Sequence, residues 1–448
     1  MGAPAQVSSK PCPAANRAWY AVAVLTVAYI LSLIDRQILS LLVVPIRRDL
    51  HISDTEMSLL MGISFALFYT LFGFPIGRLA DSRSRRNIIT VGVISWSLCT
   101  AACGLASSYF QLFFMRLGVG VGEAALSPPA YSLLSDYFPS HRRALALSVY
   151  GAGACFGAGL ALIVGGIIVA HTSAGGTVTL PLIGVSAFPW QLTFFIVGLP
   201  GVLIATLVRT ISEPARRERK AAVVLPISAT IAYIREHRTM FACHHLATSM
   251  MAVGSYATLA WIPTFLIRTY GMSAGQAGLV YGAEVSLFGS LGILVSGWLC
   301  DSLTRRGCRD AHFRVGLTVC VLILLPTVFY PLKPTPQLAL ALLVPMTFLK
   351  PATYGVAPAA LHQVVPNEMR GQISAIYLFV INLVGLGVGP TAVALVTDHV
   401  FHNDNMVRYS LLIVSTGAYL LSMLLWGLGL KPYRRTVDQM KVAIGSTA

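Results

Sequence analysis

The feature that most constrains this chain is a ten-residue pattern that occurs twice. The first copy, Gly77 to Arg86, reads Gly-Arg-Leu-Ala-Asp-Ser-Arg-Ser-Arg-Arg, and the second copy, Gly297 to Arg306, reads Gly-Trp-Leu-Cys-Asp-Ser-Leu-Thr-Arg-Arg. Each copy comes at the end of an apolar segment. A signature that returns after about 220 residues indicates a duplicated chain with two related halves.

The composition predicts that both halves lie in a membrane. Hydrophobic residues make up 56% of the 448 residues and charged residues only 11%, whereas average soluble chains carry about 25% charged residues. We therefore predict an all-α membrane protein with two pseudo-symmetric six-helix bundles. Its twelve apolar segments, each about 20 residues or longer, are 19–44, 57–80, 87–107, 109–136, 142–170, 190–209, 241–267, 275–300, 313–332, 337–362, 371–398 and 407–430.

The expected domain order follows from these segments. Two bundles around a midplane site are the architecture of carriers that work by alternating access. The parts are a cytoplasmic tail over 1–18, a first bundle over 19–209, a basic cytoplasmic linker over 210–240, a second bundle over 241–430 and a cytoplasmic tail over 431–448.

The positive charge has a topological interpretation. The net charge is +15, and most of the 32 Lys and Arg residues fall on one side of the membrane if both termini are cytoplasmic, as the positive-inside rule expects. We attribute this charge to topology and to anionic lipid rather than to nucleic acid, and expect the plasma (inner) membrane. The basic residues on the other side are Arg47, Arg48, Arg268, Lys333 and Arg408.

Charged residues also lie inside the first and fourth segments. Counted at 1.5 Å per residue, Asp35 and Arg116 lie at a similar depth, and Glu123 lies about 10 Å deeper, near the midplane. A charge at such depths costs about 2.5–3.5 kcal/mol, so acids and bases are expected to pair, Asp35 with Arg116 in particular. We expect Asp35 and Glu123 to be protonation sites and Arg116 to switch between them. A purely structural ion-pair network is the alternative.

The second half carries a weaker counterpart of this arrangement. Glu284 and Lys350 lie about 15 and 20 Å below the outer face by the same counting. They either pair with each other or leave Lys350 to meet an anionic group in a cavity. We predict that the substrate contacts Arg36, Glu123, Tyr256, Lys350 and Tyr354.

The repeated loop has a mechanical interpretation as a latch on the cytoplasmic side. Gly77 permits close helix approach, Asp81 suits a helix N-terminus, and Arg85 and Arg86 can bind carboxylates or lipid phosphates. A loop that only sets topology is the alternative. The predicted gate residues are Gly77, Asp81, Arg85, Arg86, Asp301, Arg305, Arg143 and Arg370.

These loops resemble the signatures of the major facilitator superfamily. Gly77 to Arg86 is similar to its loop between helices 2 and 3, Asp301 lies in the second-half echo, and Arg116 with Gly120 resembles the helix 4 signature. Ser84 stands where the loop usually has glycine. The proline-bearing helix 5 signature of drug/proton antiporters is missing, since 153–159 reads Gly-Ala-Cys-Phe-Gly-Ala-Gly.

Within that superfamily the chain is most similar to the spinster-type lipid transporters. The resemblance rests on Asp35-Arg36-Gln-Ile-Leu, on the stretch from Gly122 to Pro139, and on helix 11 from Met369 to Pro390. It implies proton-linked movement of lysophospholipids or sphingoid phosphates, with Asp35 and Glu123 as functional acids. The Asp35-Arg36 stretch also resembles the branch that carries organic anions together with protons.

The sequence thus predicts a secondary active transporter that moves an amphipathic lipid by proton-coupled alternating access. A proton-coupled organic-anion symporter is the alternative within the superfamily. No Walker loop, hydrolytic motif or metal-ligand spacing is present, so we expect no enzyme activity, no metal and no cofactor, with the proton gradient as driving force. A non-transporting sensor on a carrier fold is the alternative from another class. The lack of any domain outside the membrane favours a monomer.

Overall fold

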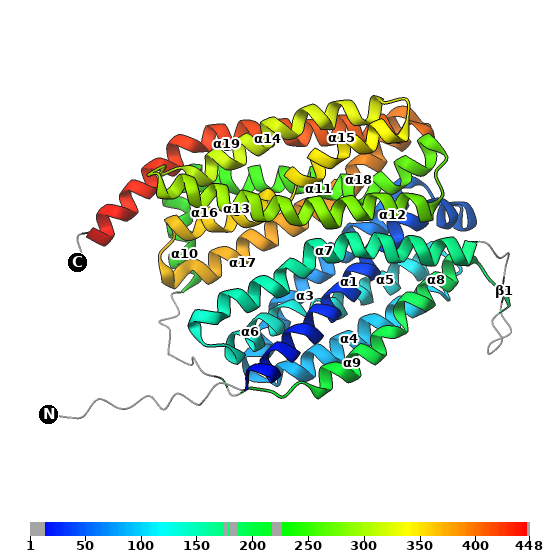
Figure 1. The fold of residues 1–448 in the computed structure, drawn as a ribbon, viewed down its shortest axis with the longest axis horizontal. Coiled ribbons are helices and arrows are strands. Elements are labelled where there is room, and N and C mark those ends of the chain that lie inside the picture. The colour runs from blue at the N-terminus through cyan, green and yellow to red at the C-terminus, as the bar shows by residue number, and fades with distance from the viewer. Residues whose placement is uncertain (1–13, 174–177, 180–185, 215, 217–225, 446–448) are drawn as a thin grey trace.

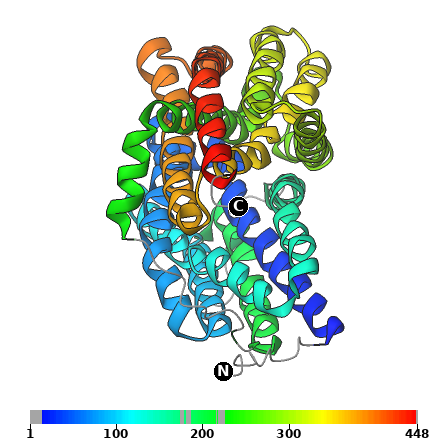
Figure 2. The ribbon, with the colours of Figure 1, turned by 90° about the vertical axis from the view of Figure 1, so that its left-hand side faces the viewer.

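The computed structural model describes residues 14–173, 178–179, 186–214, 216 and 226–445. Helices dominate it and form two elongated bundles that lie side by side, with both termini at one end and the short strand β1 at the other (Figure 1). We call these the termini end and the far end. Figure 2 views the molecule from the termini end, with the earlier helices below and the later ones above.

The first bundle holds helices up to residue 210 and a small hairpin at the far end. Strands β1 (Val178–Thr179) and β2 (Ser186–Ala187) pair antiparallel. The helices are α1 (Ala15–Leu50), α2 (Asp54–Met61), α3 (Ile63–Ser82), α4 (Arg85–Cys103), α5 (Tyr109–Glu123), α6 (Ser127–Tyr137), α7 (Ser140–Ser173), α8 (Pro189–Gly198) and α9 (Pro200–Thr210).

The second bundle follows a short linker helix, α10 (Ile227–Glu236), which packs on α17 through a 2.6 Å hydrogen bond from the Thr230 hydroxyl to Gln372. The bundle's helices are α11 (Arg238–Tyr270), α12 (Ala274–Glu284), η1 (Val285–Gly289), α13 (Ser290–Arg305), α14 (Ala311–Phe329), η2 (Tyr330–Leu332), α15 (Pro336–Leu349), α16 (Ala352–Val364), η3 (Asn367–Met369), α17 (Arg370–Ile381), η4 (Asn382–Leu386), α18 (Gly387–Leu395), η5 (Val396–Phe401), η6 (Asp404–Met406) and α19 (Val407–Gly445).

The twelve-helix prediction is confirmed. In the described part of the chain, eleven helical stretches are long and apolar enough to cross a membrane. The remaining apolar segment, 109–136, forms α5 and α6, with a turn over 124–126 between them. Pro128 and Pro129 explain the break, because neither has an N–H to donate to the carbonyl four residues earlier. Helix α19 continues to Gly445, well beyond the predicted end at 430.

Glycines hold α7 of the first half against α12 of the second. A Cβ at Gly159 would lie 2.3 Å from the carbonyl oxygen of Gly282, and one at Gly278 would lie 2.5 Å from that of Leu162. Any larger residue would push the helices apart. These glycines of α7 and α12 therefore lie at the contact between the halves.

Ion pairs join the two halves at the far end. Arg47, near the end of α1, pairs with Asp54 at 3.0 Å and also with Asp404. Arg268, near the end of α11, donates to both carboxylate oxygens of Asp54 at 2.6 and 2.8 Å. The Asp54 side chain is completely buried, so these two arginines neutralise an acid that would otherwise be costly to bury.

The far-end contact continues toward the membrane interior. The carboxylate of Asp398 accepts hydrogen bonds of 2.7 Å from both the backbone N–H and the hydroxyl of Thr55. Below them Gly62, between α2 and α3, faces the backbone of the other half. A Cβ at Gly62 would lie 2.6 Å from the carbonyl oxygen of Leu386. Only glycine allows this approach, so Gly62 is part of the contact that closes the far end.

The signature loops do not make comparable contacts at the termini end. A Cβ at Gly77 would meet only the Cβ of Pro128, at 3.9 Å and in the same half. A Cβ at Gly297 or Gly371 would have no atom of the described chain within 4 Å. The expected close helix approach at Gly77 is therefore wrong for this conformation, because the halves are joined at the far end instead.

We predict that Gly62→Val opens the far end, since the added methyl groups cannot fit against Leu386. A cysteine placed at Ser40, which lines a cavity between the halves, should then react severalfold faster than it does with Gly62 intact, when an impermeant maleimide is applied from the side of the membrane at the far end. Gly73→Val is the matched control, because a Cβ at Gly73, within α3, meets no atom of the described chain within 4 Å. Equal labelling of the two variants would contradict the assignment of Gly62 to the contact that closes the far end.

Candidate functional site

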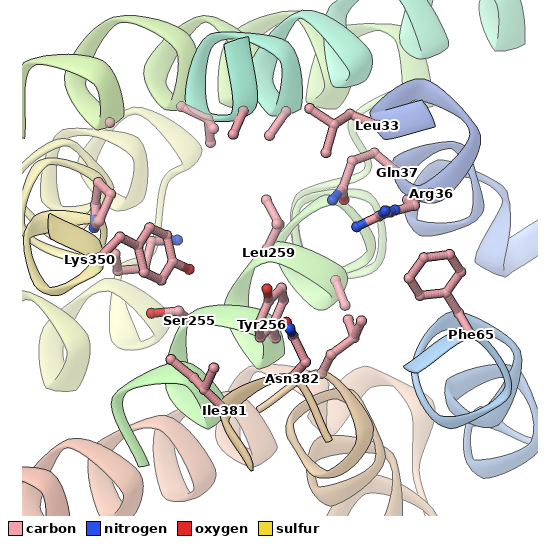
Figure 3. Close-up of a pocket in the computed structure, with 18 of the residues that line it drawn as sticks. Leu33, Arg36, Gln37, Phe65, Ser255, Tyr256, Leu259, Lys350, Ile381 and Asn382 are labelled. Carbon is pink, nitrogen blue, oxygen red and sulfur yellow. The ribbon is translucent and has the colours of Figure 1, made fainter. Parts of the chain in front are cut away.

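A cavity of about 480 Å³ lies between the two halves. Arg36 and Gln37 of α1 face it from one side, and Lys350 faces it from the opposite side (Figure 3). Aromatic side chains make up much of the remaining wall. They are Tyr29, Phe65, Tyr69, Tyr131, Tyr256, Tyr354 and Tyr377. The cavity therefore presents a basic group on each side of an amphipathic wall.

The first half contributes an ion pair between neighbouring helices. Arg36 Nε donates to Glu123 Oε2 at 2.6 Å, and Glu123 is fully buried whereas 21% of the Arg36 side chain is exposed. The guanidinium also lies over the rings of Phe65 and Tyr69, with centroid distances of 4.3 and 4.9 Å. Cation–π contacts of this kind fix the guanidinium without neutralising it. The position of Arg36 thus depends on one carboxylate and two rings.

Asp35 and Arg116 lie close together, but not as an ion pair. Arg116 donates to the main-chain carbonyl of Asp35 at 3.1 Å. Neither oxygen of the Asp35 carboxylate has a hydrogen-bond partner in the described chain, although Trp96 and Thr100 are polar neighbours. The predicted Asp35–Arg116 pair is therefore wrong in detail, because Arg116 reaches the backbone of α1. The carboxylate–arginine pair is instead Glu123 with Arg36, which depth counting alone did not identify.

Lys350 occupies the turn between α15 and α16 and is buried. Its ammonium donates to the hydroxyls of Thr258 and Tyr281 at 3.2 and 3.1 Å. Within the described chain, no ion pair of 4 Å or less joins the Lys350 ammonium to the carboxylate of Glu284. The two groups interact electrostatically over a longer distance. The direct pair is thus absent in this conformation, and Lys350 faces the cavity, as the other interpretation expects.

Of the other predicted substrate contacts, Tyr256 and Tyr354 also line the cavity, whereas Glu123 is fully buried and is not among the lining residues. Sequence reasoning missed Gln37, Phe65, Tyr69 and Asn382, which lie beside them. Gln37 directly follows Asp35-Arg36, and Phe65 and Tyr69 are one helical turn apart. An apolar sequence, however, does not show which face of each helix points into the cavity. The π-helices η1 and η4 also border the cavity, through Val285 and Asn382, and no sequence signal marked them.

Arg85 of the first signature loop is buried within its own half. It donates to Glu213 at 2.9 Å, to the carbonyl of Pro214 at 3.1 Å and to Asp136. Glu213 also accepts from the backbone N–H groups of Arg85 and Arg86 at 3.2 and 2.9 Å. An acid at the first turn of α4 is favoured by the free N–H groups there. The start of the linker therefore fills the site that a lipid phosphate would use.

Ser84 supports the same arrangement. Its hydroxyl donates to Glu213 at 2.9 Å and accepts from the N–H of Asn87 as the N-cap of α4. The departure from the usual glycine therefore adds a partner for Glu213. From the linker, Arg216 donates to the carbonyl oxygens of Ala80 and Arg83 at 2.7 and 2.8 Å.

The other predicted gate residues are less informative. The side chain of Asp81 lies outside the described residues. Arg370 donates to the carbonyls of Val365 and His362, within its own half. Asp301 and Arg305 are exposed near the end of α13, and Arg143 is half-buried near the start of α7. Their role in a gate stays a prediction.

We predict that Glu213→Gln destabilises the first half by about 1–3 kcal/mol, because it weakens the bonds of a buried arginine. Burial alone would raise the pKa of Glu213, but hydrogen bonds from Arg86, Arg85 and Ser84 outweigh it and lower the pKa. The stabilisation is then present above the ordinary glutamate pKa and is lost as pH falls through the lowered value.

Thermal unfolding in detergent checks this prediction. The deficit of Glu213→Gln against wild type should be full at pH 7 and shrink as pH falls below about 4, in the range where glutamate protonates. Glu236→Gln, at the exposed end of α10, is the control and should match wild type. A deficit that does not change with pH would argue against the carboxylate's role.

Comparison with known proteins agrees with this architecture. The family model of the Major Facilitator Superfamily matches residues 25–390. An MFS-type efflux pump of Mycolicibacterium smegmatis is 28% identical over 427 residues, which cover 94% of this chain and 95% of that protein. A probable L-galactonate transporter of Escherichia coli is 28% identical over 308 residues, covering 67% of this chain and 65% of that protein.

Spinster-type proteins are also among the similar ones. A sphingosine-1-phosphate transporter of Danio rerio is 24% identical over 336 residues, covering 69% of this chain and 61% of that protein. A crystal structure of a bacterial homologue of the human lysosomal transporter Spinster, in an inward-facing and unoccupied conformation, has a TM-score of 0.77 at 24% identity. The match covers 95% of this chain and 98% of the chain in that crystal structure, so the two share a fold.

Proposed function

The chain belongs to the Major Facilitator Superfamily and is an integral membrane transporter, not an enzyme, and we propose that it moves an amphipathic anion by proton-coupled alternating access. The substrate class is a lysophospholipid or a sphingoid-type phosphate. We further propose that it works as a monomer in the plasma (inner) membrane with both termini in the cytoplasm. The far end described above would then face outward.

The observation that carries the proposal is the ion pair between Arg36, which lines the cavity, and the fully buried Glu123. The pair neutralises itself while both partners are charged, so Arg36 attracts no further anion. Proton uptake by Glu123 removes the negative charge and leaves a guanidinium, held over the rings of Phe65 and Tyr69, facing the cavity. A substrate's acidic group can then take the place of the carboxylate.

The substrate class follows from the wall of the cavity. Basic groups at Arg36 and Lys350 suit an acidic head, and the aromatic and aliphatic lining between them suits a hydrocarbon chain. The similarity to a sphingosine-1-phosphate transporter supports the same substrate class. Asp35, with its unpartnered buried carboxylate beside Arg116, is the second candidate protonation site.

A second candidate function is symport of a small organic anion with protons. The observation that favours it is the presence of both Arg36 and Lys350 at the cavity together with many tyrosine hydroxyls. The similarity to a probable L-galactonate transporter agrees with this alternative. A sugar acid would use the hydroxyls, whereas a lipid would use the apolar wall.

Transport in proteoliposomes tests the proposal. A pH gradient should drive accumulation of a labelled lysophospholipid by wild type. Glu123→Gln should reduce this driven flux by about 100-fold or more, the scale of a general acid–base group, but should retain exchange of labelled for unlabelled lipid. Glu368→Gln, in the exposed η3 turn, is the control.

Two results would overturn the proposal in different ways. Undiminished gradient-driven flux in Glu123→Gln would remove Glu123 from proton coupling. Gradient-driven flux of a sugar acid, with no lipid flux by the same folded preparation, would establish the second candidate instead.

A further inference from the structure

We propose that Glu284 is an internal counter-ion that exchanges with the substrate's acidic group on Lys350, and that this exchange lets the empty carrier reorient. The inference rests on the proposed function in one respect, since it requires a substrate that carries an acid. It adds a role for a residue of the second half, because the proposed proton coupling uses residues of the first half and does not involve Glu284.

The first argument is the incomplete compensation of Lys350. The ammonium is buried and its hydrogen bonds go to two neutral hydroxyls, those of Thr258 and Tyr281. An ammonium has three donors, so one remains for a group in the cavity. Arg36, by contrast, already has a carboxylate. The positive charge available to an incoming anion in this conformation is therefore on Lys350.

The second argument is an unpartnered carboxylate nearby. Glu284 ends α12 and is buried, and its Oε2 has no hydrogen-bond partner in the described chain. It interacts electrostatically with Lys350 but lies beyond 4 Å from the ammonium. A buried charge is costly without a partner at hydrogen-bonding distance. Lys350 and Glu284 thus form a pair that is held apart in this conformation.

The third argument is that Glu284 lies where the halves touch. Two residues away on either side, the chain contacts α7 of the first half. A Cβ at Gly282 would lie 2.6 Å from the carbonyl oxygen of Gly159, and the Ser286 hydroxyl donates to the carbonyl of Phe156 at 3.2 Å. Lys350 belongs to the same half as Glu284, and one of its hydrogen bonds goes to Tyr281 of the same helix, α12. Rocking of one half against the other therefore acts on Glu284 through its contacts with α7, and a local change at the end of α12 is what alters its distance from Lys350.

The local helix geometry allows such a displacement. The π-helix η1 begins at Val285, directly after Glu284, and borders the cavity. The wider turn of a π-helix can convert to an α-turn, which shifts the residues before it. An empty carrier would close with Glu284 on Lys350, and a loaded carrier with the substrate's acid on Lys350. Both closed forms then bury a neutral pair rather than a lone ammonium.

Binding measurements on purified protein test the exchange. The probes are oleoyl lysophosphatidate, which has an acidic head, and monooleoylglycerol, which has the same chain and no charge. Glu284→Gln should bind the acidic probe about tenfold more tightly, which corresponds to the loss of one competing charged partner, and the neutral probe unchanged. Glu284→Asp should restore the wild-type affinity. Glu284→Gln should have no effect in a Lys350→Met background.

Transport by the same variants distinguishes reorientation from binding. Glu284→Gln should retain exchange of labelled for unlabelled substrate but lose net uptake, because only net uptake needs the empty carrier to return. Thermal unfolding without ligand establishes that each variant is folded. An unchanged or weaker affinity in Glu284→Gln, or an equal gain in the Lys350→Met background, would overturn the exchange.

The lipid proposal and the exchange can fail separately. If wild type binds no lysophosphatidate, the lipid proposal fails, and wild type and the same variants are titrated with D-galactonate. A tenfold gain confined to Glu284→Gln would then support the exchange with a sugar acid as substrate. The absence of any Glu284-dependent change with either acid would overturn it.

Discussion

The pairing of charges inside a water-poor helix bundle is the constraint on which the rest of this structure depends. Arg36 lines the cavity and Glu123 is fully buried beside it on another helix, and each neutralises the charge of the other. A buried pair of this kind contributes little net stability, but losing the charge of one partner strongly changes the state of the other. Protonation of one carboxylate is therefore enough to change which ligands the cavity attracts.

The same principle governs the contacts between the halves. At the far end the buried Asp54 is neutralised by Arg47 and Arg268, and the second arginine comes from the other half. Opening the far end removes part of the positive charge that neutralises Asp54. The closed far end is therefore favoured until another conformation gives these charged groups new partners. The glycines of α7 and α12 bring the backbones of the two halves into close contact.

Much of this could be predicted from the sequence. The duplicated loop and the hydropathy predicted two bundles of six helices, and the charges within apolar segments identified Asp35, Arg36, Arg116, Glu123 and Lys350 as residues of the interior. The pairing was harder, because depth along a helix does not determine rotation about its axis. Asp35 and Arg36 are neighbours, so a rotation of about 100° decides which of them faces Glu123.

The far-end cluster and Glu213 were missed for related reasons. Arg47 and Arg268 were noticed only as exceptions to the charge bias, although basic residues on the less favoured side are good candidates for ion pairs. Glu213 lies more than a hundred residues from the loop that it caps, and nothing in its local sequence indicates that distance. The π-helices could not be foreseen, because they depend on packing between helices rather than on residue preference.

The most direct measurement of the central claim is proton movement itself. Wild-type protein in proteoliposomes loaded with a pH-sensitive dye, without an imposed pH gradient, should change the internal pH when a gradient of lysophospholipid is applied, and protons should move with each substrate molecule. Substrate flux of normal rate with no change in internal pH would contradict the account, because it would show that the charges around Glu123 do not exchange protons during transport.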